Sequence, residues 1–184
     1  MKDKWKGVAN VPNALTVLRL LLIPIVWRFL YEGRMMNALI VFCIAGFTDI
    51  LDGYLARKNN QITWFGKLLD PLADKLMTLV LALGFYERGI VPPAAFFILL
   101  IKELLMLIGA LFLLKQSRVV YSKAIGKAAQ FTVFSALVLC FFYEYFNRIN
   151  FPLHIILLWI GVCLTLAALL YYAYQNIYLY FKEK

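Results

Sequence analysis

Long apolar runs alternate with short polar stretches along the whole chain, and six of the runs are candidates for membrane-spanning helices. Each approaches the roughly 20 residues that a helix needs to cross a lipid bilayer. The pattern therefore predicts an all-α integral membrane protein, with residues 1–184 forming a single membrane-embedded domain. The six expected transmembrane helices cover residues 14–31, 37–57, 70–86, 92–114, 124–143 and 152–174.

The composition agrees with this prediction. Hydrophobic residues make up 64% of the chain and charged residues only 16%, against roughly 45–50% and about 25% in soluble domains. The first apolar run follows three lysines, as a secretory signal would. However, it contains Arg19 and Pro24, and no small-residue cleavage site clearly follows it, so we expect a retained helix.

The basic residues predict the orientation in the membrane. If the N-terminus is cytoplasmic and six helices alternate, the 19 Lys and Arg residues fall on or near the inner side, except Arg28, Arg34, Arg88 and Arg148. This is the positive-inside pattern, and it places both termini on the cytoplasmic side of a bacterial-type cytoplasmic membrane. The net charge of +9 then suits anionic lipid headgroups, and no nucleic-acid partner is needed to explain it.

Four aspartates stand out against this apolar background. Asp49 and Asp52 lie three residues apart at the inner end of the second predicted helix, and Asp70 and Asp74 lie four apart at the inner start of the third. Each pair shares one helix face, and the short connection predicts that the two helices are antiparallel neighbours whose acidic ends converge. Helix capping would explain Asp70 or Asp74, but the helix dipole opposes Asp49 and Asp52.

Converging carboxylates repel one another, and a bound divalent cation would relieve the repulsion. Ligation by oxygen alone suits a hard ion such as magnesium, manganese or calcium, and magnesium typically bridges carboxylates and substrate phosphates. Gly53, Ala56 and Gly66 lie on the same faces as the acids, where small side chains allow close helix packing or leave room for a ligand. Arg57 can neutralise phosphate oxygens.

At every signature position the chain resembles the CDP-alcohol phosphotransferases. Their motif is present here as Asp49-x-x-Asp52-Gly53-x-x-Ala56-Arg57 and, eight residues later, Gly66-x-x-x-Asp70-x-x-x-Asp74. Residues 11–19 resemble the beginning of these enzymes, and the similarity extends from about residue 10 to residue 140. The resemblance implies a homodimeric membrane transferase with six helices and a cytoplasm-facing site.

The resemblance also implies roles for the motif residues. Asp49, Asp52, Asp70 and Asp74 would hold Mg²⁺ or Mn²⁺, as two ions. Asp74 would also take the proton from the acceptor hydroxyl. The cytidine nucleotide of CDP-diacylglycerol would lie against the small residues, and Arg57 would contact its diphosphate. The acceptor oxygen would attack the lipid-attached phosphorus, and CMP would leave. The small residues against which the cytidine nucleotide would lie are Gly53, Ala56 and Gly66.

The acceptor stays open at this stage. Overall the chain is most similar to the phosphatidylglycerophosphate synthases, whose acceptor is glycerol 3-phosphate, and Lys102, Arg118 and Lys127 are candidates to bind that phosphate. Those synthases carry an Arg-Glu pair and a further Arg in their fourth helix, where this chain has Lys102-Glu103 and Ala110. Residues 126–131 instead resemble the cardiolipin synthases that use phosphatidylglycerol. A small cation transporter is a third alternative, since intramembrane acids also mark ion pathways.

Lys102 and Glu103 lie well inside the fourth predicted helix. Neighbouring residues point about 100° apart on a helix. We therefore expect one of these side chains to face the polar cavity and the other to find a partner on a neighbouring helix.

Overall fold

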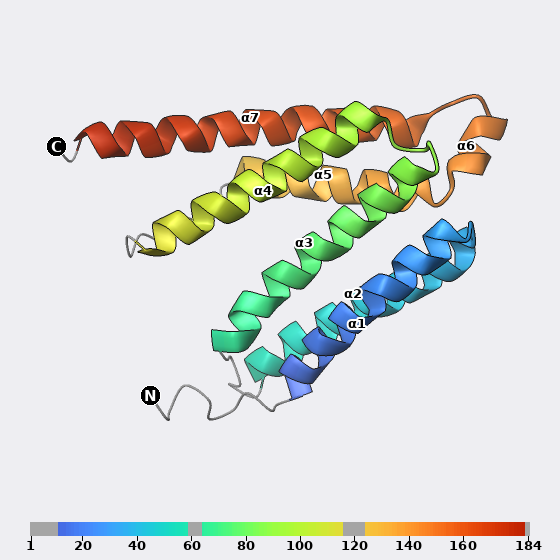
Figure 1. Cartoon of the computed structure of the whole chain (residues 1–184), viewed down its shortest axis with the longest axis horizontal. Coiled ribbons are helices and arrows are strands. Elements are labelled where there is room, and N and C mark those ends of the chain that lie inside the picture. Colours follow the sequence, from blue (N-terminus) through green and yellow to red (C-terminus); the bar gives the residue numbers. More distant parts are fainter. Residues whose placement is uncertain (1–10, 59–63, 116–123, 183–184) are drawn as a thin grey trace. The chain divides into compact units, whose positions relative to one another are not determined.

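The computed structural model describes residues 11–58, 64–115 and 124–182, and every element in these ranges is a helix (Figure 1). The long helices match the six predicted ones in order and approximate position. Their bounds are α1 Val11–Tyr31, α2 Met35–Lys58, α3 Trp64–Glu87, α4 Pro93–Lys115, α5 Ala124–Cys140, α6 Tyr143–Arg148 and α7 Leu153–Lys182.

The largest differences from the sequence prediction are the start of α3, the end of α7 and the presence of α6. Helix α3 begins at Trp64, six residues before the predicted start, because Gly66, Lys67 and Asp70 interrupt the apolar pattern in its first two turns. Helix α7 continues to Lys182 through a tyrosine-rich segment. The short helix α6 was not predicted, since a helix of six residues is too short to show an apolar period.

Length and hydropathy identify two candidate membrane spans among the described residues, Ala14–Tyr31 and Leu153–Tyr171. Met35–Asp49 and Ile125–Cys140 are shorter apolar helices. The all-helical architecture is thus confirmed, whereas six membrane crossings stay a prediction.

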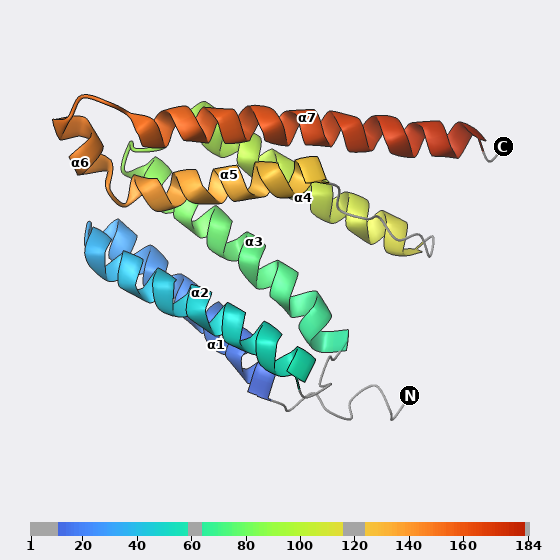
Figure 2. The ribbon, with the colours of Figure 1, turned by 180° about the vertical axis from the view of Figure 1, so that it is seen from behind.

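Residues 1–88 form the first of two compact units, in which α1 packs against both α2 and α3. The buried face of α1 recurs every three or four residues, the spacing of a helix stripe that faces a core. The two views of the ribbon agree that α2 runs back alongside α1 (Figures 1 and 2). The stripe on α1 consists of Thr16, Arg19, Ile23, Val26 and Leu30.

The turn between α1 and α2 is a Schellman motif with Gly33 at its left-handed position (φ 77°). The Gly33 amide donates to the Leu30 carbonyl at 3.0 Å and the Arg34 amide to the Phe29 carbonyl at 2.8 Å, which is the hydrogen-bond pattern of this motif. Arg88, just after α3, donates to the Leu30 carbonyl at 3.2 Å. This contact ties the end of α3 to the same turn.

Residues 89–184 form the second unit, in which α7 packs against α4, α5 and α6. Gly161 lies at a close approach between α5 and α7. A Cβ atom added there would lie 2.8 Å from Val133 Cγ2 and 3.0 Å from the Val133 backbone nitrogen. Gly161 therefore lets the two helix backbones approach, as small residues do in membrane helix pairs.

Replacing Gly161 by alanine should destabilise the second unit, because the new methyl group meets the backbone of α5 and the helices must separate. We expect a cost of about 1–3 kcal/mol, measured as a lower thermal unfolding midpoint in detergent. Gly46→Ala is the matched control, since nothing lies within 4 Å of a Cβ at that helical position. Equal midpoints for the two variants would contradict the close packing.

Candidate active site

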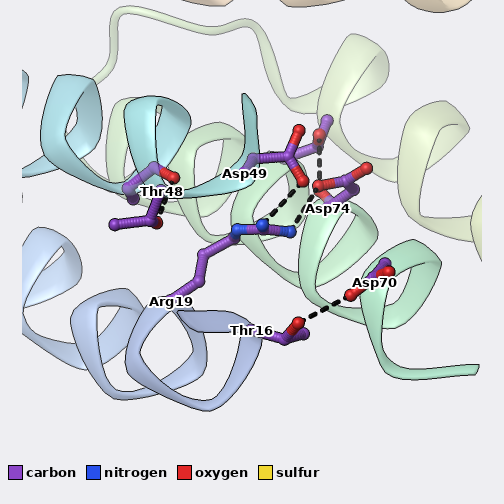
Figure 3. A network of polar contacts seen from close by, with 8 residues as sticks. Thr16, Arg19, Thr48, Asp49, Asp70 and Asp74 are labelled. Atoms are coloured by element: carbon purple, nitrogen blue, oxygen red, sulfur yellow. Dashed lines mark hydrogen bonds and ion pairs between the residues drawn. The ribbon is translucent and has the colours of Figure 1, made fainter. Parts of the chain in front are cut away.

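The candidate site lies at one end of the first unit, where three helices bring polar side chains together. Asp49 lies in the second half of α2, and Asp70 and Asp74 lie in the first half of α3. Thr16 and Arg19 come from the first half of α1. Because α2 runs antiparallel to α1 and α3 returns in the direction of α1, these segments meet at the same level (Figures 1 and 3).

Arg19 is the centre of this arrangement. Its side chain is only 3% exposed, and its Nη2 lies 2.6 Å from Asp49 Oδ1. Its Nη1 lies 3.3 Å from Asp74 Oδ1. One guanidinium therefore joins carboxylates from two different helices, and such charge-assisted contacts are among the strongest polar interactions in proteins.

Asp70 is held by the same helix. The hydroxyl of Thr16, a residue that is 1% exposed, donates to Asp70 Oδ1 at 2.7 Å. The Thr48 and Thr78 hydroxyls donate to the backbone carbonyls of Ala45 and Asp74, so these bonds satisfy local backbone; Figure 3 shows Thr48 beside the acidic cluster. Helix α1 thus contacts each predicted site aspartate whose side chain the structure describes, namely Asp49, Asp70 and Asp74.

The donor chemistry suits a hard divalent ion, since the carboxylates supply only oxygen. The Asp49 and Asp74 side chains already converge on one cationic group, and they are 43% and 58% exposed. Within the described residues no three His, Cys, Asp or Glu side chains gather closely enough to enclose an ion. The side chain of Asp52 lies outside that description, so the predicted set of four ligands is untested.

Several other predicted site residues cannot be compared with the structure at the level of side chains. Arg118 lies outside the described residues, and Lys127 is exposed on α5. The remaining motif residues occupy the last turns of α2 and the first turn of α3, but their side chains are not described. These residues are Asp52, Gly53, Ala56, Arg57 and Gly66.

Comparison with known proteins identifies the family of the chain. The family described as CDP-alcohol phosphatidyltransferase matches residues 9–167. The chain belongs to this family. The match covers α1 to α6 and the first half of α7, so it includes residues of both compact units.

Several relatives of the chain share the name CDP-diacylglycerol–glycerol-3-phosphate 3-phosphatidyltransferase. The protein from Aquifex aeolicus (strain VF5) is 40% identical over 109 residues, covering 58% of this chain and 61% of the relative. That from Pseudomonas fluorescens is 52% identical over 84 residues, covering 44% and 43%. That from Bacillus subtilis (strain 168) is 32% identical over 177 residues, covering 86% and 91%. The chain thus spans less than two-thirds of the first two relatives and nearly all of the third.

Sequence reasoning missed the contribution of α1. We expected α2 and α3 to bring their acids together directly, whereas the structure shows α1 contacting both helices and Arg19 joining their carboxylates. A signal was present. Arg19 is an ionisable residue inside an apolar run, and such residues need a partner or a polar cavity.

In the second unit, Lys102 and Glu103 pair with each other. Lys102 Nζ lies 2.5 Å from Glu103 Oε1, with the side chains 12% and 7% exposed. Lys102 also donates to Gln130 Oε1 on α5 at 3.3 Å. The expected partner on a neighbouring helix is therefore Gln130. The ion pair between Lys102 and Glu103 themselves was not expected, and it forms because both side chains are long enough to bend together.

Replacing one partner of this ion pair should destabilise the protein more than replacing both partners. Lys102→Met leaves the Glu103 carboxylate buried without its cation, which should cost about 3–5 kcal/mol, whereas replacing both residues by methionine should cost much less. Thermal unfolding of the single and double variants measures the difference. A double variant that is less stable than Lys102→Met would show that the pair does not act as a unit.

Proposed function

We propose that the protein is a phosphatidyltransferase of phospholipid biosynthesis that transfers a phosphatidyl group from CDP-diacylglycerol to glycerol 3-phosphate, giving phosphatidylglycerophosphate and CMP. The observation that carries the proposal is the meeting of Asp49 and Asp74 at one buried guanidinium, with Asp70 held from the same helix. Family membership and the names of the relatives support this choice of substrates.

Asp74 is the proposed general base. Its carboxylate is 58% exposed while one oxygen contacts Arg19, so the group is both fixed and accessible to an acceptor hydroxyl. Asp74 takes the hydroxyl proton as the acceptor oxygen bonds to the lipid-attached phosphorus. The bond between that phosphorus and the bridging diphosphate oxygen breaks, and its electrons leave with CMP. Proton transfer by a positioned base of this kind typically contributes about 10²–10⁴-fold to the rate.

The other motif residues bind and orient the donor lipid. Asp49, Asp52, Asp70 and Asp74 would hold Mg²⁺ or Mn²⁺, as two ions in our proposal. Such ions, when bound, neutralise diphosphate charge and make the phosphorus more electrophilic. Gly53, Ala56 and Gly66 leave room for the cytidine nucleotide, and Arg57 contacts the diphosphate. Fixing the two reactants in this way supplies much of the rate enhancement in an in-line displacement.

A second acceptor, phosphatidylglycerol, is favoured by one observation. A doubly charged glycerol 3-phosphate needs basic partners, but Lys102 is engaged by Glu103 at 2.5 Å. This pairing leaves Arg118 and Lys127 as the other predicted phosphate ligands. With phosphatidylglycerol as the acceptor the product would be cardiolipin, and the roles of the aspartates would be unchanged.

The two apolar helices and the family support a membrane protein. Large apolar side chains such as Leu21, Phe47 and Leu170 are exposed on the described helices, which suits contact with lipid tails. We further propose six membrane crossings, both termini and the active site on the cytoplasmic side, and a homodimer as the working form.

CMP release tests the reaction and the base together. The purified protein with CDP-diacylglycerol and Mg²⁺ should release radiolabelled CMP when glycerol 3-phosphate is added, and Asp74→Asn should lower the rate at least about 100-fold because the base is lost. Glu87→Gln, an exposed acid at the far end of the same helix, is the control and should retain full activity.

Testing glycerol 3-phosphate and phosphatidylglycerol separately in this assay distinguishes the two proposed acceptors. Release with phosphatidylglycerol but not with glycerol 3-phosphate would replace the proposed acceptor by the alternative. Release with neither would overturn the proposed function, and an active Asp74→Asn variant would remove Asp74 from the role of base.

Reporter fusions test the topology. Six crossings with a cytoplasmic N-terminus should make a C-terminal green fluorescent protein fluoresce, and alkaline phosphatase should be active when fused after Gly33 or Asn150, in the predicted outer turns. Active phosphatase at the C-terminus would indicate an odd number of crossings and contradict the prediction.

A further inference from the structure

The stripe of α1 that faces α2 and α3 changes character along its length. Toward the turn at Gly33 it is apolar, with Ile23, Val26 and Leu30, while its first two positions are Thr16 and Arg19. These two residues are 1% and 2% exposed. Burying a hydroxyl and especially a guanidinium is costly unless their partners are well placed. The cost of burying Thr16 and Arg19 must therefore be offset by the contacts that their side chains make.

Thr16 and Arg19 both contact aspartates of the site. Each of these described contacts engages one oxygen of its carboxylate: Asp70 for Thr16, and Asp49 and Asp74 for Arg19. In Figure 3 the other carboxylate oxygens of Asp49 and Asp74 point away from the guanidinium. The guanidinium is 3% exposed, whereas the two carboxylates are 43% and 58% exposed. The carboxylates are thus held from their buried side and open on the other.

We propose that Thr16 and Arg19 are positioning residues of the acidic site: they hold Asp70, Asp49 and Asp74 from behind, so that the outward oxygens are preset for a divalent cation. The proposal rests on the proposed function only in assigning these aspartates to a metal-dependent site. Arg19 does not stand in for the ion. It orients two of the predicted ligands and offsets their mutual repulsion before the ion arrives.

Arginine is suited to this task by its shape as well as its charge. Its planar fork places two nitrogen atoms on two different carboxylates at once, while a lysine ammonium is a single point charge. Arg19→Lys should therefore keep the charge and lose the geometry. Arg19→Gln loses both. If Arg19 merely competed with the ion, Arg19→Gln would strengthen cation binding, so the sign of the change separates the two roles.

The test is equilibrium binding of Mn²⁺ to the purified full-length protein without substrate, followed by the electron paramagnetic resonance signal of free Mn²⁺. Removing groups that orient metal ligands typically weakens affinity about 10–100-fold. We expect a loss in this range for Arg19→Gln, a smaller loss for Arg19→Lys, and a several-fold loss for Thr16→Val that Thr16→Ser restores.

Arg28→Gln is the matched control. Arg28 lies on the same helix, but it is exposed and pairs locally with Glu32 at 2.9 Å, so its removal should leave Mn²⁺ affinity unchanged. Thermal unfolding of every variant identifies general damage to the fold. If Arg19→Gln does not fold, Arg19→Lys and the Thr16 pair still decide the question.

Three results would overturn the proposal. These are unchanged Mn²⁺ affinity in the Arg19 and Thr16 variants despite lower stability, tighter Mn²⁺ binding in Arg19→Gln, and no saturable Mn²⁺ binding by the wild type. Its failure is distinguishable from failure of the proposed function. A wild type that binds Mn²⁺ but releases no CMP with either acceptor would reject the reaction and leave the positioning role intact.

Discussion

The ion pairs of one buried guanidinium tie the packing of the first unit to its chemistry. Arg19 lies in the same stripe of α1 as the apolar residues that form the core, so it faces inward wherever that stripe packs. A cation in such a place requires anionic partners, and α2 and α3 provide them as Asp49 and Asp74. The packing of α1 and the shape of the acidic site are therefore set by the same contacts.

The other end of the unit sets the level at which these groups meet. Gly33 begins the return of the chain into α2, and Arg88 ties the end of α3 to the same turn. At 1.5 Å per residue, Arg19 and Asp49 lie about 21 Å and about 24 Å from Gly33, and Asp74 lies about 21 Å from Arg88. The polar groups of the three helices therefore lie at nearly equal distances along their helices from the turn that Gly33 and Arg88 form.

The sequence was informative where the physical signal was long or repeated. Six apolar runs predicted the six long helices, and the spacing of the aspartates predicted that acids from α2 and α3 converge. It was less informative about single side chains. The role of Arg19 depends on which face of α1 is buried, and the pairing of Lys102 with Glu103 depends on side-chain reach, which helical angles alone do not describe. Helix α6 was too short to show a hydrophobic periodicity in the sequence.

The charge balance explains how Arg19 can order the site and still leave it attractive to a cation. Within the described contacts, one guanidinium faces the two carboxylates of Asp49 and Asp74, and Asp70 receives only a neutral hydroxyl from Thr16. Repulsion between the helices is reduced, but the set stays negative. A second fixed cation in these contacts would remove half of the remaining negative charge and weaken the attraction for a divalent ion, and an apolar residue in place of Arg19 would leave the carboxylates to repel one another. A single arginine on the buried side meets both requirements, and it does so without covering the open face where the proposed ion and diphosphate would bind.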